Sequence, residues 1–224
     1  MKIIYLLLVL SAITFFSAGQ EYRFSANIFG GSMYYLASSN STTQIKQDGN
    51  FDAGLLFSYR PDKVFEIKAG LAFFSKRFSE YYDYSTPPPP YYETENHYFL
   101  YYYRLPLVLG FHVWDNKKFD VYINTGLSLA HLFAKDRSSH YANGSVVVGF
   151  DSLTYYYRDP LYFDFGGGIK YHLKDNLSIN LEPWFRYMYL DDFIRVKDAY
   201  TVSLSHSEIG LHVGIVYDFN LPKK

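Results

Sequence analysis

Apolar and polar residues alternate along most of the chain beyond residue 20. A period of two places successive side chains on opposite faces of a strand, whereas a helix would repeat every 3.6 residues. Near the C-terminus, for example, Ile209, Leu211 and Val213 alternate with Gly210 and His212. The pattern predicts eight strands and no helix in the mature chain. The stretches run over about 22–34, 51–60, 64–78, 96–114, 119–134, 158–173, 177–190 and 203–219.

The segments between these stretches alternate in length. Residues 61–63, 115–118 and 174–176 make short turns, whereas 35–50, 79–95, 135–157 and 191–202 make long, polar, tyrosine-rich loops. The stretches reach the roughly 9–11 residues that a tilted strand needs to cross a bilayer. Short turns at one rim, in the periplasm, and long extracellular loops at the other are typical of outer-membrane barrels. Within the third long loop, Val146–Phe150 and Leu153–Tyr157 are too short to cross, so we expect them to form a hairpin outside the membrane.

The polarity of the inward face distinguishes a membrane barrel, whose interior is polar, from a lipocalin, whose interior is apolar. Eight glycines share the face that carries the charges, and glycine weakens a strand unless space there is restricted. An eight-stranded barrel is just wide enough for its own side chains, so a crowded interior accounts for them. These glycines are Gly54, Gly70, Gly110, Gly126, Gly166, Gly168, Gly210 and Gly214. We therefore expect a polar interior and an apolar outer band, where a charge at mid-depth would cost about 2–4 kcal/mol.

Aromatic residues gather toward the two ends of the predicted strands, as the girdles of membrane barrels do. The set near the short turns is Tyr59, Trp114, Phe119, Tyr171, Tyr217 and Phe219. The set near the long loops is Tyr81, Tyr82, Tyr98, Tyr101, Tyr187 and Tyr189. High β-propensity would explain the number of aromatics but not their clustering at strand ends.

The first 19 residues have the features of a secretory signal peptide. Lys2 precedes an apolar run from Ile3 to Phe16, and small residues at 17–19 offer a cleavage site. The run is shorter than the ~20 residues of a membrane-spanning helix. We expect a signal peptide over residues 1–19, an outer-membrane β-barrel domain over residues 20–224, and export to the bacterial outer membrane.

Composition removes several classes of function. The 224 residues include no cysteine, which excludes disulfides, thiolate metal sites and a cysteine nucleophile. Lys and Arg number 21 against 22 Asp and Glu, and no dense basic cluster is present that could bind nucleic acid. Nucleic acid is not an expected partner; the expected partners are outer-membrane lipid and other envelope or secretion-system proteins.

The segment 103–110 contains Arg104, Leu105, Pro106 and Leu107. It resembles the (E/R)-(I/L)-P-L-L-L signature of the PorT-like outer-membrane β-barrel family, which is common in Bacteroidetes. The hairpin over 166–182 is similar to that family's penultimate hairpin, and the last strand, which ends at Phe219, resembles a barrel-assembly signal. The resemblance implies an eight-stranded barrel of the OmpA/OmpX-like type. It says little about activity, because the family includes secretion-system components.

Nine charged residues fall on the inward face and form the predicted lumen charge network. They are Glu66, Lys68, Arg104, Asp120, Asp164, Lys170, Glu182, Arg186 and Glu208. In so narrow a lumen they must pair, so we expect a plug of polar side chains, since open channels need about 16 strands. A gated ion pathway is the alternative. Counting along the hairpin centred on Asp175 places Asp164 opposite Arg186 and Lys170 opposite Asn180.

The sequence offers candidate residues for two kinds of chemistry, metal binding and catalysis. His112, His172 and His212 point inward, but from strands that are not neighbours, so we predict neither a metal nor a cofactor. The run 205–208 raises the alternative of a lipid A-modifying enzyme. In a strand, however, His206 and Glu208 would point inward and the serines toward lipid, which prevents a Ser–His dyad. We expect no enzyme.

The second long loop offers a surface for binding. Its proline run would be stiff and extended, and rigid tyrosine-rich surfaces favour binding. The loop candidates are Tyr84, Pro87, Pro88, Pro89, Pro90, Tyr91 and Tyr92. We predict a non-enzymatic barrel that is structural or binds partners through its loops, with an accessory component of a protein secretion system as the first alternative.

Overall fold

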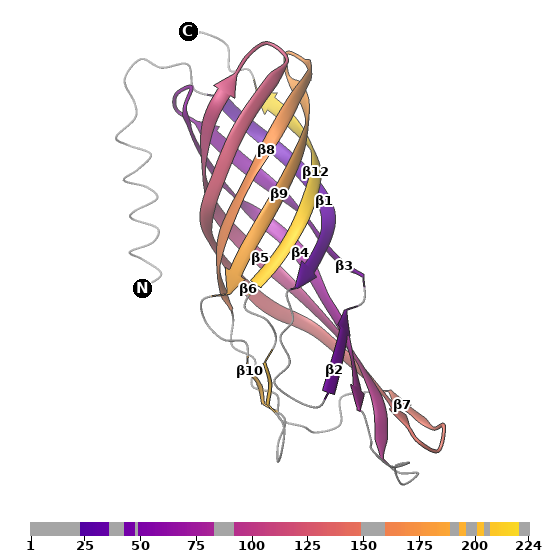
Figure 1. The fold of residues 1–224 in the computed structure, drawn as a ribbon. Helices are drawn as coiled ribbons and strands as arrows, with labels where there is room; N and C mark the ends of the chain where they lie inside the picture. The colour runs from indigo at the N-terminus through magenta and orange to yellow at the C-terminus, as the bar shows by residue number, and fades with distance from the viewer. Residues whose placement is uncertain are drawn as a thin grey trace.

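The computed structural model shows one closed barrel, from which three strands run on past the loop-side end (Figure 1). It describes residues 23–35, 43–47, 49–82, 92–148, 160–188, 193–195, 201–203 and 207–219. The predicted signal peptide therefore lies outside the described residues. The barrel strands are β1 (Arg23–Tyr35), β3 (Asn50–Arg60), β4 (Phe65–Tyr82), β5 (Glu93–Asp115), β6 (Phe119–Tyr141), β8 (Leu161–Lys174), β9 (Leu177–Met188) and β12 (Ser207–Phe219). The short strands are β2 (Thr43–Gln47), β7 (Val146–Val148), β10 (Phe193–Arg195) and β11 (Thr201–Ser203).

Every barrel strand pairs antiparallel with its two neighbours. The first strand, β1, pairs with both β3 and the last strand, β12, so the ends of the chain close the barrel. The remaining pairs follow chain order, from β3 with β4 round to β9 with β12. This confirms the eight-stranded antiparallel barrel. Among the described residues, no helix is long and apolar enough to cross a membrane.

Three strands are longer than a crossing requires. β5 and β6 have 23 residues each and β4 has 18, whereas β8, β9 and β12 have 12–14. β4 leaves β3 after the pair Asp52↔Phe74, and β6 leaves β8 after Leu129↔Leu161. Beyond these points, residues 75–82 of β4, 93–103 of β5 and 130–141 of β6 form a sheet that we call the extension. β2 and β7 form its two edges.

The extension corrects one expectation about the long loops and adds to another. The segments 79–82, 93–95 and 135–141 are paired strand and not open loop, because the residues of each strand find partners on the next. The predicted hairpin of Val146–Phe150 with Leu153–Tyr157 did not include a pairing with β6, and its second half lies outside the described residues. Val146–Val148 pairs with residues 138–140 of β6.

Burial confirms the predicted inward and outward faces of the clear strands. On β12, Val213 and Ile215 are 52% and 58% exposed, whereas Glu208 is 1% exposed. The inner wall is crowded at a position that carries glycine. A Cβ on Gly168 would lie 2.6 Å from the ring of Tyr122. The apolar face is therefore the surface that lipid covers.

Most aromatics near the short turns project outward, as the girdle requires. Trp114, Phe119 and Tyr217 are among those exposed. On the loop side, Tyr187 is exposed, but Tyr98 is buried and its ring stacks on Phe78 with centroids 4.7 Å apart. Placing Tyr98 in the girdle was wrong, because its even number on β5 puts it on the inward face. The side chains of Tyr82 and Tyr189 lie outside the described part.

Candidate functional site

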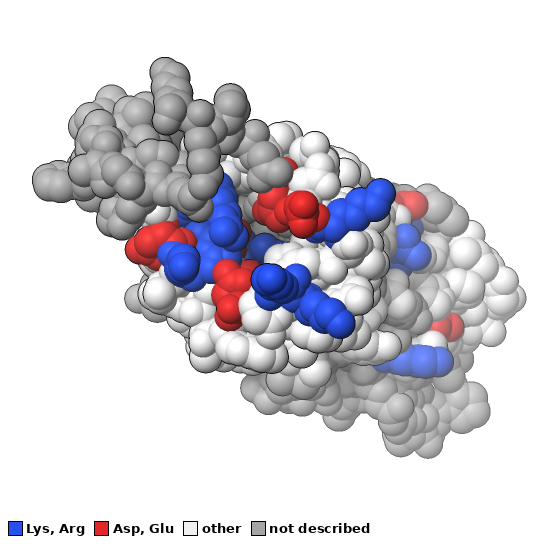
Figure 2. Space-filling view, turned by 90° about the horizontal axis from the view of Figure 1, so that it is seen from above, with Lys and Arg blue, Asp and Glu red and all other residues white. Residues whose placement is uncertain are grey.

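The lumen near the short turns is filled by one group of paired charges, which we call the turn-side network. It consists of Arg60, Glu66, Lys68, His112, Asp115, Asp120 and Lys170. Arg60 lies 3.0 Å from Asp115 and 3.2 Å from Asp120. The ring of His112 joins Asp120, at 2.6 Å, to Glu66, at 3.1 Å. Figure 2 looks onto this end, where basic and acidic side chains lie side by side.

A second group, the loop-side network, fills the lumen toward the extension. It consists of Asp52, Lys76, Arg104, Asp164, Arg186, Glu208 and His212. Arg186 is its centre, since the guanidinium lies 2.8 Å from Asp52, 2.8 Å from Asp164 and 3.0 Å from Glu208. Arg186 is 1% exposed, so all of these contacts are shielded from water.

The loop-side network is balanced in charge. Arg104 binds Asp52 at 3.0 Å and Asp164 at 3.5 Å, and Lys76 binds Glu208 at 3.1 Å. Three cations thus meet three carboxylates, with His212 as a further ligand of Asp52. A buried charge is tolerated when it is paired, and removing one partner leaves the other uncompensated. The arrangement therefore holds only as a complete set.

The predicted hairpin register is confirmed. Asp164 stands directly opposite Arg186, and Lys170 opposite Asn180. Alternation also shows which members of the networks the sequence reasoning missed. Asp52 and Arg60 share the inward face of Gly54, and Lys76 shares that of Lys68. Counting by two along β3 and β4 would have found these three. Asp115 was missed as well, because it follows a register shift near the end of β5.

Of the nine predicted lumen residues, eight join ion pairs in the two networks. Glu182 is the exception, because among the described residues it forms no ion pair and accepts a hydrogen bond from the hydroxyl of Tyr122 at 2.9 Å. Lys68 is held at the same ring, with its Nζ 4.2 Å from the centroid of Tyr122. The structure therefore groups the predicted residues into two clusters and not into one continuous network.

Aromatic rings close the lumen around the loop-side network. The Arg186 guanidinium lies 4.1 Å from the ring centre of Trp184 and 5.5 Å from that of Tyr162. Phe74 stacks on Tyr102 with centroids 4.8 Å apart. Such cation–π contacts gain strength where the cation is desolvated. The plug is thus aromatic as well as charged, which the polar-plug prediction did not include.

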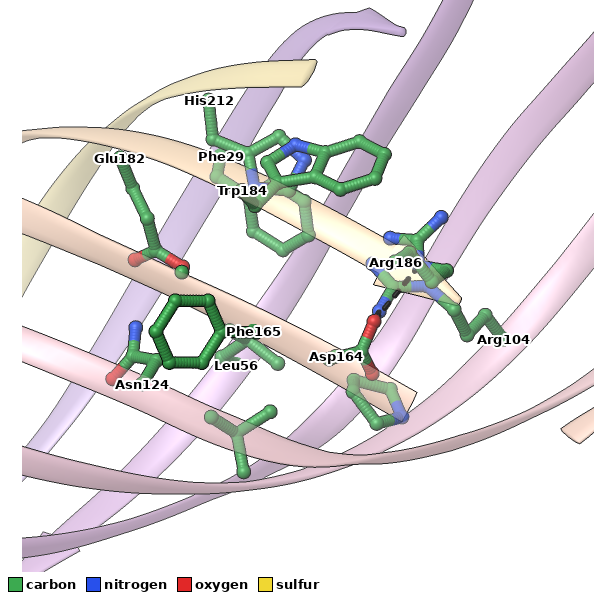
Figure 3. A pocket seen from close by; sticks show the side chains of 13 residues that line it. Phe29, Leu56, Arg104, Asn124, Asp164, Phe165, Glu182, Trp184, Arg186 and His212 are labelled. Carbon is green, nitrogen blue, oxygen red and sulfur yellow. Dashed lines mark hydrogen bonds and ion pairs between the residues drawn. The ribbon is translucent and has the colours of Figure 1, made fainter. Parts of the chain in front are cut away.

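A cavity of about 40 Å³ lies beside the loop-side network (Figure 3). The labelled Arg104, Asp164 and Arg186 close one side of it, and Asn124 and Glu182 lie on the other. A water molecule needs roughly 10–15 Å³ of such space, so the cavity holds about three or four waters. Apolar side chains such as Phe29, Leu56 and Trp184 also line it, and its size leaves no room for a drug-sized ligand.

The inward histidines are occupied by protein groups. Nδ1 of His172 contacts Ser178 at 2.9 Å, and Nε2 of His212 contacts Asp52 at 3.3 Å. One set in the described chain could present ligands to a metal, since atoms of Asp115, Asp120 and His172 lie within 4.8 Å of one another. The Arg60 guanidinium already binds both of these carboxylates, so a cation would have to displace it.

Candidate catalytic groups are also poorly arranged. Ser205 and His206 lie outside the described residues, whereas Glu208 is buried in the loop-side network. A different Ser–His–carboxylate contact occurs in the extension. Ser79 Oγ lies 2.7 Å from His97 Nδ1, and His97 Nε2 lies 3.1 Å from Glu95. Ser79 is 1% exposed, so a substrate carbonyl could not reach its hydroxyl.

The family-like motif occupies the wall of the barrel. Arg104 points inward to the loop-side network, Leu105 is 52% exposed toward lipid, and Leu107 is half-buried. Pro106 has no N–H, and the β4–β5 register has no pair between Ala69↔Leu107 and Ala72↔Arg104. Of the loop candidates, Tyr92 is 43% exposed. Tyr84, the proline run and Tyr91 lie outside the described residues.

A closed antiparallel barrel with an apolar outer surface and a charged lumen defines a transmembrane β-barrel of the outer-membrane type. Sequence comparison agrees, because the profile of the family "Outer membrane protein beta-barrel domain" matches residues 17–189. The chain belongs to this family and is an outer-membrane protein. A search of curated protein sequences gives no match.

Solved structures show the same fold. The chain is similar to the outer membrane protein OprG from Pseudomonas aeruginosa, with a TM-score of 0.56 and 12% identity over 90% of this chain and 97% of that one. It is also similar to the E. coli outer membrane protein W, with a TM-score of 0.54 and 13% identity over 89% of this chain and 99% of that one. At such identities the likeness concerns the fold.

Proposed function

We propose that the protein is a non-enzymatic outer-membrane barrel that is closed to ions and presents its extension to partners outside the cell. The observation that carries the proposal is the extension itself. β5 and β6 continue for about 10 residues beyond the closed barrel, which at roughly 3.3 Å per residue amounts to about 30 Å of sheet. A crossing does not need this length, so a role outside the membrane accounts for it.

The extension has the composition of a binding surface. It carries Tyr81, Tyr92 and Tyr141 at its far end, and of these Tyr92 is 43% exposed. Cross-strand pairing holds the sheet, so its backbone is already ordered before a partner arrives. Tyrosines on an ordered backbone contribute contact area at low cost in entropy.

Site-specific photo-crosslinking in intact cells tests this proposal. A photoreactive residue at Tyr92 should give discrete adducts of higher mass, whereas the same residue at Asn116, in a short turn on the other side of the membrane, should not give those adducts. Identical adduct patterns at both positions, or none at Tyr92, would contradict a binding role for the extension.

The narrower assignment, a PorT-like accessory component of a secretion system, rests on the resemblance at residues 104–107. In the barrel, Arg104 holds Asp52 and Asp164, which supports a structural use of the motif. Loss of secretion on deletion of the gene would favour the accessory role. The lipid A-modifying alternative finds no support in the buried Ser79, and an unchanged lipid A mass on overexpression is the expected result.

A further inference from the structure

The outward face of β4, β5 and β6 changes character step by step toward the extension. Leu105 and Leu129 form an exposed apolar row and are directly paired. Above them lies an aromatic cluster of Phe73, Tyr101, Tyr103 and Phe133, with Phe133 within 6.5 Å of the other three rings. Above this cluster, Arg77 and then Lys46 follow on the same face. This order of apolar, aromatic and basic residues matches the order of acyl chains, interface and headgroups in a membrane leaflet.

Arg77 lies within cation–π distance of two aromatic rings. Its guanidinium carbon lies 5.9 Å from the ring centres of Phe99 and of Tyr101. Its Nε is shielded from water and donates to no group in the described chain. Among the described residues Arg77 forms no ion pair, although a guanidinium in this position can bind an anion with its two outer nitrogens. Within the described part of the chain, this cation is therefore positioned without a counterion.

Lys46 adds a second cation within reach of the same anion. It is exposed on β2 and pairs with Ser79, which places it diagonally from Arg77 across the β2–β4 ladder. Diagonal neighbours of this kind are about 7–8 Å apart, close enough for both side chains to contact one phosphate. Among the described residues Lys46, too, has no ion-pair partner.

Two carboxylates on this face have described side chains near the pair, and both contact other groups. Asp136 stands opposite Phe99, two strands away from Arg77, and accepts the backbone N–H of Arg137 at 2.8 Å. Glu95 is engaged by His97 at 3.1 Å. Neither neutralises the pair formed by Arg77 and Lys46, so this part of the face attracts an anion.

The height of the pair in the membrane indicates which anion it meets. From Phe65, at the turn-side rim, to Arg77 the rise is about 30 Å, at roughly 3.3 Å per residue and a tilt of about 40°. The apolar band of a membrane barrel is about 25 Å tall, so Arg77 stands just beyond it, at the level of the outer headgroups. Phosphate is the anionic group that lipids carry at this level.

We propose that Arg77 and Lys46 bind the phosphate of an outer-leaflet lipid whose headgroup rests on the aromatic cluster and whose acyl chains lie along Leu105 and Leu129. This lipid site is distinct from the partner surface proposed above. It faces the membrane and uses the base of the extension, so it would remain even if no protein partner existed.

Native mass spectrometry of the full chain tests the site. The protein is placed in phosphatidylcholine nanodiscs that contain a fixed fraction of diphosphoryl lipid A, and the lipid A retained after ejection is counted. Arg77→Gln should lower the apparent affinity about tenfold to a hundredfold, the effect of losing a charge-assisted hydrogen bond. Lys46→Gln should lower it less. Arg23→Gln, which removes an exposed cation at the opposite rim, should leave it unchanged.

Three results would overturn the proposal. The first is equal retention by Arg77→Gln and the unaltered protein, both confirmed as folded by their gel mobility without heating. The second is equal retention of lipid A from which the phosphates have been removed. The third is displacement of lipid A by millimolar inorganic phosphate with the same dependence on Arg77, which would assign the site to the free ion and not to a lipid.

Discussion

At the residue scale, glycines in the inner wall create the space that large side chains fill. A Cβ on Gly168 would meet the ring and hydroxyl of Tyr122 at 2.6 Å, and this hydroxyl also binds Glu182. On Gly30, by contrast, the nearest atom would be 3.9 Å away. The two positions therefore make a matched pair for testing the crowded interior.

We predict that Gly168→Ala lowers the free energy of unfolding by about 1–3 kcal/mol, the usual cost of overpacking. Gly30→Ala should change it by less than about 0.5 kcal/mol, because the added methyl meets no obstacle. Urea unfolding in lipid vesicles, followed by tryptophan fluorescence, measures both. Equal losses in the free energy of unfolding for the two variants would contradict the crowding around Gly168.

The loop-side network gives a second prediction at this scale. Arg186→Ala leaves Asp52, Asp164 and Glu208 with one cation fewer, so it should cost about 3–5 kcal/mol, as breaking a buried pair does. Removing Asp164 as well restores the balance, because Arg104 still binds Asp52 and Lys76 still binds Glu208. The double variant should therefore be more stable than Arg186→Ala alone.

The same vesicle assay, arranged as a double-mutant cycle, measures this coupling. Additive losses for Asp164→Ala and Arg186→Ala would mean that the two side chains do not share the contact at 2.8 Å. Arg186→Lys is a useful companion variant, because it keeps the charge but cannot present three guanidinium nitrogens to three carboxylates.

At the scale of elements, the extension and the short turns should lie on opposite sides of the membrane. The chain has no cysteine, so single introduced cysteines can report topology without background. Ser138→Cys, in the part of β6 beyond the barrel, should react with a membrane-impermeant maleimide on intact cells. Asn116→Cys should react only after the cells are opened. The reverse pattern would invert the orientation of the barrel.

Sequence alone predicted the barrel strands well, because lipid outside and crowding inside impose a period of two on every crossing. It predicted the ends of β4, β5 and β6 poorly. Whether a strand stops at the rim depends on a partner beyond it, such as β2 beside β4, and alternation does not report this. The pairing of β7 with β6 was missed for the same reason.

The contacts of the candidate site also differ in how far the sequence could predict them. The contact of Asp164 with Arg186 could be predicted, because hairpin register is a local property of two consecutive strands. The contacts of Arg186 with Asp52 could not. They cross the lumen between β9 and β3, which are not neighbours in the sheet, so they depend on how the tilted strands stagger around the barrel.

At the scale of the whole molecule, two balanced charge networks and an aromatic layer occupy the lumen. A cavity of only about 40 Å³ lies beside the loop-side network. An ion would have to separate desolvated pairs on its way through, and each such separation is costly. The barrel is therefore expected to be closed while its outer surface and its extension remain available for binding.

Electrical recording in planar lipid bilayers tests this closed lumen most directly. The purified, folded protein is added to a bilayer in which a 16-stranded porin, added separately, gives clear unitary steps. We predict no sustained unitary conductance from this protein over the same range of voltage. Reproducible channels of porin size would contradict the account, because they would require a continuous water-filled path through networks that the structure shows as packed and paired.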